Sequence, residues 1–262
     1  MDLGLKDKVV IVAASSQGLG RATAERFAVE GARLAICARN EKSIRAVADD
    51  LRTRESADVL AAACDVTDPG AVHRFCAAVA ERFGRIDVCV TNAGGPPAKG
   101  FLAVTVEDWR RAVDLNFLSV VHFAREVIPH MQRQRWGRFI TLTSVSVKQP
   151  VPELILSNAV RSAVVGLVRS LANEFGRDGI LFNNVGPGFT ETDRVKELAA
   201  IRAQAGNVSP ESVKAQWAAA TAVGRIGRPE EVADTIVWLA SERASNITGQ
   251  TILVDGGSYK GV

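Results

Sequence analysis

The sequence predicts a single α/β domain built on a doubly wound, Rossmann-like parallel sheet. Short β-branched runs alternate with longer amphipathic segments along the chain, and most of these runs are apolar throughout rather than alternately apolar and polar. Continuous apolar runs are typical of strands that helices cover on both faces. At 262 residues with 47% hydrophobic side chains, the chain fits one domain spanning residues 1–262.

The elements follow one another in the order strand, helix, strand, with short links, and about seven strands are expected. The runs that predict strands are KVVIVAA, ARLAICAR, DVLAAACDV, IDVCVTNAG, GRFITLTS, ILFNNVGPG and TILVDGG. Helices are expected at 18–30, 41–54, 69–83, 106–134, about 159–175 and 229–241. Residues 189–228 break the alternation with small helices, and we expect them to form a lid over the carboxyl ends of the strands.

Composition excludes several classes of function. The net charge of +3 is small and the basic residues are scattered among acids, which does not favour nucleic acid. No run approaches the roughly 18 apolar residues of a membrane span, and the start MDLGLKDK lacks the apolar core of a secretory signal, so we expect a cytoplasmic protein without a membrane partner. The cysteines have no metal-ligand spacing and are expected to be reduced core residues, with no metal site: Cys37, Cys64, Cys76 and Cys89.

The first strand-to-helix loop has the composition of a dinucleotide-binding turn. It reads AASSQGLG over residues 13–20, and Gly18 and Gly20 allow a helix to begin close to the sheet. The N–H groups and the dipole of such a helix start favour a pyrophosphate. The same composition also serves merely to pack a helix on a sheet, so the loop alone is a weak indication.

The end of the second strand indicates which nicotinamide dinucleotide would bind. An acidic residue there would accept hydrogen bonds from the adenosine ribose, whereas Ala38 followed by Arg39 offers space and positive charge for a 2′-phosphate. NADP(H) is therefore favoured over NAD(H). The alternative is that Arg39 is a solvated residue at the start of a helix.

Motifs spread over essentially the whole chain resemble the short-chain dehydrogenase/reductase family, and most of all its β-ketoacyl-acyl-carrier-protein reductase-like members. They are the glycine loop at 14–20, Asp65-Val66, Asn92-Ala93-Gly94, Asn116, Ser144, PGFTET at 187–192 and ITGQTILVDGG near the end. The resemblance implies that Asn116 holds a water and that Ser144 binds the substrate oxygen. It implies cofactor contacts from Ala14, Ser16, Gln17, Gly18, Leu19, Gly20, Arg39, Asp65, Val66, Asn92, Ala93, Gly94, Arg161, Pro187, Gly188, Thr190 and Thr192.

The sequence departs from the family at two places. Ala14 stands where the family has the first glycine of its loop, which puts a methyl group near the adenosine side of the cofactor. In SNAVR, Ser157 stands where the family has the Tyr of its YxxxK pair, and Arg161 takes the Lys position. The helix continues in the family's style through SAVVGLVRSLANEF, so the register is kept.

These replacements change the expected chemistry. An alkyl hydroxyl is far less acidic than a phenol of pKa about 10, so Ser157 cannot donate the proton directly. Arg161 can bind ribose hydroxyls and favour a developing alkoxide, but it cannot relay protons. A water, held by Ser157 and Ser144 and connected to Lys148 where needed, is the expected donor. The remaining candidates have weaker positions: Tyr259, close to the C-terminus, and the helical His73, His122 and His130.

Two hypotheses about function remain open. The first is an NADP(H)-dependent oxidoreductase that interconverts a ketone, with 3-oxoacyl thioesters as one class, and a secondary alcohol through a nonstandard proton donor. The second is a catalytically silent dinucleotide-binding or regulatory protein. The joint presence of Asn116, Ser144 and Arg161 favours the enzyme.

The sequence also bears on partners. Arg135 resembles a basic carrier-docking position of the family, but the second such position holds Asp178, beside Arg177, so an acyl carrier protein is not favoured. The helix predicted at about 159–175 is apolar on more than one face, which predicts a homotetramer or at least a dimer.

Overall fold

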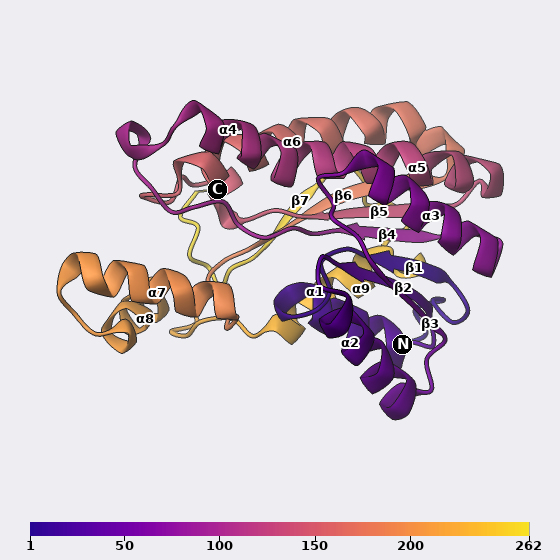
Figure 1. Ribbon diagram of the computed structural model, residues 1–262, viewed down its shortest axis with the longest axis horizontal. Coiled ribbons are helices and arrows are strands. Elements are labelled where there is room, and N and C mark those ends of the chain that lie inside the picture. Colours follow the sequence, from indigo (N-terminus) through magenta and orange to yellow (C-terminus); the bar gives the residue numbers. More distant parts are fainter. Residues whose placement is uncertain (262) are drawn as a thin grey trace.

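Seven parallel strands form one sheet in the order β3-β2-β1-β4-β5-β6-β7 in the computed structural model, which describes residues 1–261 (Figure 1). The order reverses direction between β1 and β4, as in doubly wound folds. The predicted fold class is confirmed. The strands are β1 Val9–Val12, β2 Arg33–Ala38, β3 Val59–Ala63, β4 Val88–Thr91, β5 Gly137–Leu142, β6 Ile180–Pro187 and β7 Thr251–Val254.

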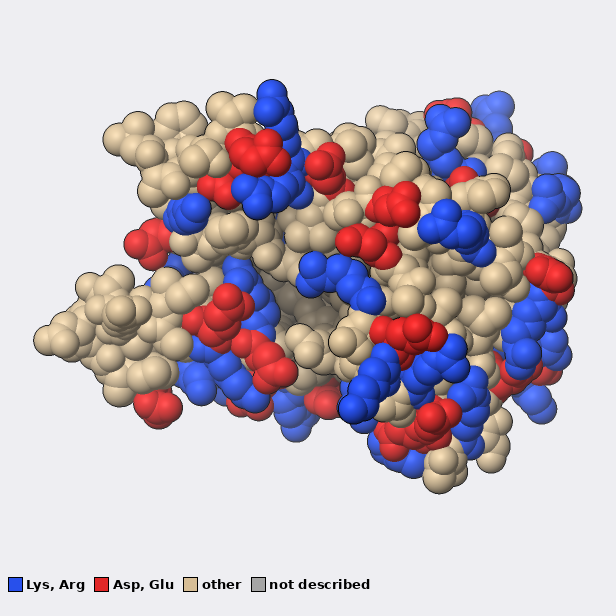
Figure 2. Space-filling model, in the orientation of Figure 1, with Lys and Arg blue, Asp and Glu red and all other residues tan. Residues whose placement is uncertain are grey.

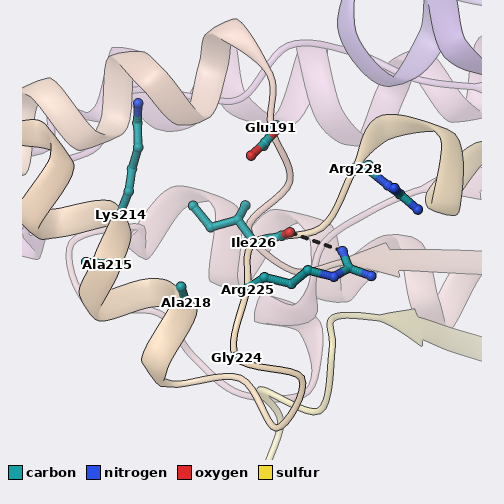
Figure 3. A pocket seen from close by; sticks show the side chains of 8 residues that line it. All are labelled: Glu191, Lys214, Ala215, Ala218, Gly224, Arg225, Ile226 and Arg228. Atoms are coloured by element: carbon teal, nitrogen blue, oxygen red, sulfur yellow. Dashed lines mark hydrogen bonds between the residues drawn. The ribbon is translucent and has the colours of Figure 1, made fainter.

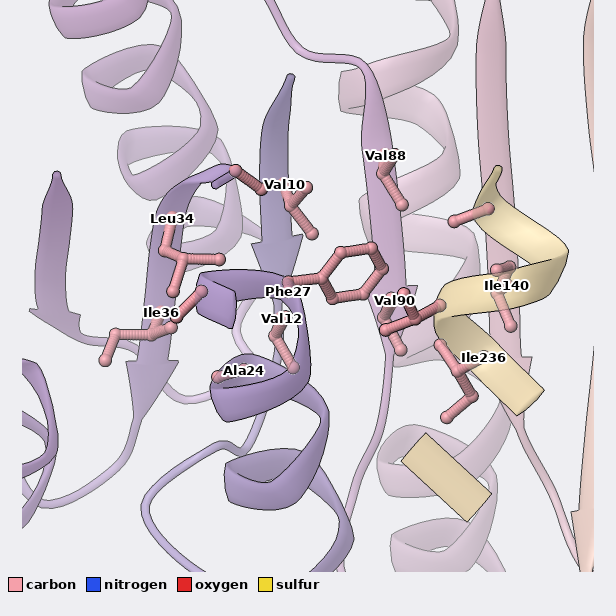
Figure 4. Close-up of a cluster of buried hydrophobic side chains, with 14 of the residues drawn as sticks. Val10, Val12, Ala24, Phe27, Leu34, Ile36, Val88, Val90, Ile140 and Ile236 are labelled. Atoms are coloured by element: carbon pink, nitrogen blue, oxygen red, sulfur yellow. The ribbon is translucent and has the colours of Figure 1, made fainter. Parts of the chain in front are cut away.

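Helices cover both faces of this sheet (Figure 1). One face carries α1 Gly18–Val29, α2 Glu41–Glu55 and α9 Pro229–Ala240. The other carries α3 Pro69–Phe83, α4 Val106–Val113, α5 Ser119–Gln134 and α6 Ile155–Phe175. In the first layer, the fully buried Phe27 lies between the valines of β1 and β4 (Figure 4). Burial of one such side chain contributes about 1.5–3 kcal/mol, so layers of this kind hold the strand ends in fixed positions.

Two helices differ from the sequence prediction, and both differences lie at the candidate site. The helix expected at 106–134 is interrupted by a π-helical turn at Asp114–Leu118, which contains Asn116. Such turns inside helices are frequent at functional sites. The helix expected from about 159 begins at Ile155, because Leu156 is fully buried and extends the apolar face toward the N-terminus.

Residues 189–228, the predicted lid, project from the carboxyl edge of the sheet (Figure 1, orange) and are called the lid below. Its helices are α7 Asp193–Gly206 and α8 Pro210–Ala219. They share a small apolar cluster of their own, and Trp217 stacks on Phe189 with ring centroids 4.0 Å apart. Arg202 of α7 donates to the carbonyl oxygen of Pro152 at 3.0 Å, which ties the lid to the segment before α6.

The α6 helix is long and apolar enough, by length and composition, to be a candidate membrane span. It packs along β6, however, and buries a stripe of residues beneath it, as the core helix of a folded domain does. The four cysteines are buried and form no disulfide with one another, as expected for core thiols.

Candidate active site

The loop after β1 leaves the first turn of α1 open to an anion. Gln17 precedes the helix without a capping side-chain hydrogen bond, and the first turn contains no acidic residue. Ser15 is buried and donates to the carbonyl oxygen of Val12 at 3.0 Å, which holds the turn against its own strand. Gly18 has φ +57°, which favours glycine. The uncapped N–H groups and the helix dipole therefore point to the place expected for a pyrophosphate.

Gly20 locks this loop against the loop that follows β4. A Cβ atom at Gly20 would lie 2.5 Å from the carbonyl oxygen of Ala14 and 2.9 Å from Nδ2 of Asn92. Asn92 Nδ2 donates to that same carbonyl oxygen at 3.4 Å. The close approach explains why glycine is needed here, and it brings two of the sequence-predicted segments together.

The adenosine side of the site contains an exposed arginine. Arg39 follows β2 and forms no ion pair with any residue from 1 to 261. Asp65 accepts hydrogen bonds from the Thr67 N–H at 3.0 Å and the Thr67 hydroxyl at 2.8 Å. The Thr67 N–H, and to a smaller extent the charge of Arg39, lower the pKa of Asp65. Val66 beside it is buried. Arg39 thus keeps its guanidinium free for a ligand.

The segment after β6 reaches the start of α1. A depression of about 230 Å³ is lined by residues of both segments, among them Gly18 and Thr192. A Cβ atom at Gly18 would lie 3.5 Å from Thr192 Cγ2. Thr190 is buried and donates to the carbonyl oxygen of Gly188 at 3.2 Å, which shapes the turn after Pro187. Of the remaining sequence-predicted contacts, Ser16, Leu19 and Ala93 are partly buried and Gly94 is exposed.

Asn116 projects from the π-helical turn toward the loop after β4. Its Nδ2 donates to the carbonyl oxygen of Gly94 at 2.9 Å, and the side chain is 4% exposed. Its Oδ1 is buried and has no hydrogen-bond partner among the residues described. Because buried polar atoms are nearly always satisfied, this oxygen suits a bound water.

Ser144 and Ser157 are linked through Ser146. Ser144 Oγ accepts a hydrogen bond from the Ser146 N–H at 3.1 Å, while Ser146 Oγ lies 3.5 Å from Ser157 Oγ. A hydroxyl that accepts one bond still has its own proton to donate, so Ser144 is arranged to donate to a substrate oxygen. Ser157, only 7% exposed, faces Ser146 rather than Ser144. A water held jointly by Ser144 and Ser157 therefore remains a prediction.

Arg161 lies one helical turn beyond Ser157 and is buried against the end of β5. Its Nη1 donates to the carbonyl oxygens of Leu142 at 2.9 Å and Thr143 at 3.2 Å. Burial, and to a smaller extent the charge of Arg194, lower the pKa of Arg161 to about 10. The guanidinium is consequently still charged at neutral pH.

The other candidate proton donors differ in position. Lys148 is exposed immediately after the short turn at Val145–Val147. Tyr259 lies in a C-terminal tail whose next residue, Lys260, donates its N–H to Gln149 Oε1 at 3.3 Å. The tail therefore runs beside the Ser144 loop, closer to the site than its sequence position suggests.

The histidines lie on the helices α3 and α5, as expected. His73 pairs with Glu126 Oε2 at 3.0 Å, and His122 Nδ1 lies 3.3 Å from the carbonyl oxygen of Val66. Burial, and then the charge of Arg133, lower the pKa of His130. None of the three makes a recorded hydrogen bond to Ser144, Ser157 or Arg161.

The carrier-docking position is also tied within the chain. Arg135 donates to the carbonyl oxygen of Arg177 at 3.1 Å, and Asp178 accepts from Gln132 at 2.7 Å. These contacts add no support to the hypothesis that an acyl carrier protein binds here.

Two residues near the site were missed in the sequence. Ser146 is buried between the two predicted serines, and Arg194 of α7 donates to the carbonyl oxygen of Pro96 at 2.7 Å. The serine run SVS could have indicated Ser146, since it follows Ser144 directly. Nothing local marks Arg194, because only the folded lid brings it to the loop after β4.

A second depression, of about 410 Å³, lies within the lid region and contains none of the predicted site residues (Figure 3). Lys214, Arg225, Arg228 and Glu191 line it. Arg225 and Arg228 both pair with Glu231, at 2.6 and 3.3 Å, so much of its positive charge is neutralised.

The fold and the motifs in its loops define the class of this protein. The chain belongs to the short-chain dehydrogenase/reductase family: the family described as Enoyl-(Acyl carrier protein) reductase matches residues 13–259. The sequence-based prediction of an NAD(P)-dependent short-chain oxidoreductase is thereby confirmed at the level of the family.

Individual relatives span almost the whole chain. Short-chain reductase protein NovJ of Streptomyces niveus is 36% identical over 252 residues, covering 96% of this chain and 94% of that protein. The 3-oxoacyl-[acyl-carrier-protein] reductase FabG of Escherichia coli is 31% identical over 257 residues, covering 98% and 99%.

Solved structures agree with the fold. L-sorbose reductase from Gluconobacter frateurii, complexed with NADPH and L-sorbose, superposes with a TM-score of 0.95 at 30% identity and covers 100% of both chains. An actinorhodin polyketide ketoreductase variant with NADPH gives a TM-score of 0.92 at 30% identity, covering 96% of this chain and 97% of that one.

Proposed function

We propose that this protein is an NADP(H)-dependent oxidoreductase that interconverts a ketone and a secondary alcohol. The observation that carries the proposal is the hydrogen-bond arrangement at Ser144. Its Oγ is already an acceptor from the Ser146 N–H, which leaves its proton to donate to a carbonyl oxygen at the carboxyl edge of the sheet. The α1 N-terminus lies along the same edge, so an oxyanion donor and a dinucleotide cradle occur together.

The residues present fit the cofactor. Gly20 has no room for even a methyl group, and the α1 N-terminus is uncapped, as a close pyrophosphate requires. Arg39, exposed and without an ion pair among residues 1–261, would hold a 2′-phosphate. The NADPH in the two solved structures compared above supports the preference for NADP(H) over NAD(H). When bound, the cofactor supplies or accepts the hydride at the substrate carbon.

The chain's own residues then orient and polarise the substrate. Ser144 donates a hydrogen bond to the carbonyl oxygen, and Arg161, still charged at neutral pH, favours negative charge developing there. Ser157 has no acidic proton at neutral pH, so the proton reaching that oxygen comes from water. Asn116 Oδ1, buried without a partner among the residues described, is one site at which such a water would be held.

A silent binding protein is the second candidate, and one observation favours it. Ser157 Oγ is turned to Ser146 Oγ, so the side chain at the family's tyrosine position makes a structural contact. A protein that had lost the catalytic activity would need only such a structural contact at this position. The two candidates differ in what Ser144 does.

Steady-state reduction of a panel of ketones and 3-oxoacyl thioesters with NADPH distinguishes them. We expect the parent protein to turn over slowly. In Ser144→Ala, kcat/KM should fall by about 10²-fold or more. In Ser157→Ala the fall in kcat/KM should be smaller, because Ser157 only positions a replaceable water. Binding of NADPH with no reduction of any compound, by the parent or by either variant, would establish the silent binder instead.

The assembly we propose is a homotetramer, or at least a dimer, formed through α6. Its outward face carries small side chains that allow close helix contact: Ala159, Ser162, Ala163, Gly166 and Ser170 are exposed. Light scattering at micromolar concentration should give a mass at least twice the 28.0 kDa of one chain. A monomer under those conditions would contradict the proposal.

A further inference from the structure

Two guanidinium groups come near each other at the candidate site, since the charge of Arg194 lowers the pKa of Arg161. Arg161 reaches it from α6, and Arg194 reaches it from the lid helix α7. Arg161 is 9% exposed and belongs to no ion pair within residues 1–261. A charge so deeply buried without a counter-ion is costly, so the arrangement needs an explanation.

The hydrogen bonds of Arg161 are incomplete. A guanidinium has five N–H donors, and the two on Nη1 are used by the carbonyl oxygens of Leu142 and Thr143. The three on Nε and Nη2 have no acceptor in the part of the chain that the structure describes. Neither nitrogen is among the fully enclosed atoms that lack a partner, so each keeps some exposed surface.

Arg194 is held over the neighbouring strand end. Its Nη2 donates to the carbonyl oxygen of Pro96, and a Cβ atom at Gly95 would lie 3.0 Å from its Nε. Glycine at 95 thus lets the guanidinium lie against the backbone. The loop that it touches is also held by Asn116 through Gly94.

Arg161 has no carboxylate partner among residues 1–261, whereas the carboxylate that pairs with Arg194 lies at the surface. The charge that acts on Arg161 is that of Arg194, and no carboxylate offsets it. Arg194 itself pairs with Glu197 at 2.8 Å, but Glu197 is more than half exposed. Figure 2 shows the surface hollowed between the lid and the main body, with blue Lys and Arg side chains at the rim.

We propose that Arg161 and Arg194 bind a carboxylate of the substrate, so that the natural substrate is an oxo acid or the corresponding hydroxy acid. This inference rests on the proposed function and names its substrate class. A planar carboxylate matches the fork of a guanidinium, and two such groups on opposite walls would fix its orientation. Ser157 is smaller than the tyrosine that the family has at this position, which suits a substrate with an additional charged group.

The test compares ligands that differ only in charge. We would use 2-oxo, 3-oxo and 4-oxo acids and their methyl esters, because the spacing between carbonyl and carboxylate is open. Binding to the protein saturated with NADP⁺ would be measured by calorimetry, and reduction with NADPH by steady-state kinetics. The variants are Arg194→Gln, Arg194→Lys and, as a matched control on the neighbouring lid helix α8, Lys214→Gln, whose side chain lines the depression that contains none of the predicted site residues.

We expect at least one acid to bind about 10- to 100-fold more tightly than its ester, as for charge-assisted hydrogen bonds. Arg194→Gln should abolish that preference, Arg194→Lys should restore part of it, and Lys214→Gln should leave it unchanged. Esters that bind as well as every acid, no binding of either class, or a preference that survives Arg194→Gln in a folded protein would overturn the inference. Should Arg194→Gln fail to fold, the acid and ester comparison in the parent decides alone.

The two proposals fail in different ways. An acid that binds preferentially but is never reduced would refute the oxidoreductase and leave the anion site standing. Ketones that are reduced without any preference for acids would refute the anion site and leave the oxidoreductase standing.

Discussion

The two halves of the carboxyl edge differ in how closely they keep the chemistry of the family. On the β1 to β3 side, the glycine loop, the uncapped α1 N-terminus and Arg39 form the proposed dinucleotide cradle, with the residue types that the family has there except at Ala14. On the β5 to α6 side, Ser157 and Arg161 stand where a phenol and an ammonium are expected. The difference indicates that cofactor binding and proton transfer are separable requirements, carried by different loops of one sheet.

The largest expected effect comes from giving the β5 to α6 side its missing acid. Ser157 and Arg161 are four residues apart on α6, so Ser157→Tyr with Arg161→Lys places a phenol beside an ammonium. We expect kcat/KM for neutral ketones to rise by about 10²- to 10⁴-fold, the usual contribution of a positioned acid. Steady-state kinetics with NADPH measures it.

The matched control keeps the ring and removes the acid. Ser157→Phe with Arg161→Lys should give no comparable gain, and only the tyrosine variant should lose activity at high pH as its phenol ionises. Equal gains in both double variants would mean that the site lacked packing rather than a proton donor.

The next effect tests the cradle. Gly20→Ala would place a methyl carbon 2.5 Å from the carbonyl oxygen of Ala14. The strain of such overpacking costs about 1–3 kcal/mol, and since this loop would contact the cofactor, NADPH affinity should fall about 10- to 100-fold. Fluorescence titration and thermal unfolding measure the two effects.

Gly176→Ala is the control, because a Cβ atom there meets nothing within 4 Å and φ is −59°. If Gly20→Ala bound NADPH as the parent does, the loop would not approach the cofactor, and the contrast between the two halves would collapse.

A smaller effect separates the two cofactors. Arg39→Gln should lower the affinity for NADPH by about tenfold and leave the affinity for NADH nearly unchanged, because a charge-assisted hydrogen bond to the 2′-phosphate would be lost. The difference should shrink as ionic strength rises. Arg45→Gln, an exposed change on the helix α2 that follows Arg39, breaks only a pair with Glu41 and should alter neither affinity. An unchanged preference in Arg39→Gln would remove Arg39 from the site.

Most of the fold could be predicted from the sequence because it depends on local patterns. Apolar runs give the strands, and the helix at 69–83 agrees at both ends, where Asp68 caps it and Gly84 ends it. The π turn at 114–118 could not be predicted. It depends on Asn116 reaching Gly94 across the fold, a contact that leaves no periodic signal.

Part of the candidate site could likewise be predicted from the sequence, and part could not. Glycines, Arg39, Ser144 and the SNAVR segment are visible as motifs, and the structure places them along one edge of the sheet. Which hydroxyl faces which was not predictable, since the Ser157 to Ser146 contact is decided by the rotation of α6 against the turn at 145–147. Arg194 was not predicted as a site residue, because its place depends on the position of the lid and not on its neighbours in sequence.

The smallest expected effect concerns Ala14, the one departure within the cradle. Its φ of +49° is left-handed, a conformation that costs a residue with a Cβ atom about 1–2 kcal/mol. Ala14→Gly should relieve that cost, although the greater freedom of glycine in the unfolded chain takes back about 0.4–1 kcal/mol. We expect a net gain of between about 0 and 1.6 kcal/mol in the free energy of unfolding, a rise of about 2–4 °C in Tm for each kcal/mol gained, and an NADPH affinity up to about fivefold higher. Ala13→Gly is the control: Ala13 is fully buried and lacks a positive φ, so the same substitution one residue earlier should destabilise the protein. If both glycine variants lost stability and NADPH affinity alike, Ala14 would be suited to its place, and this half of the site would have diverged from the family as far as the other.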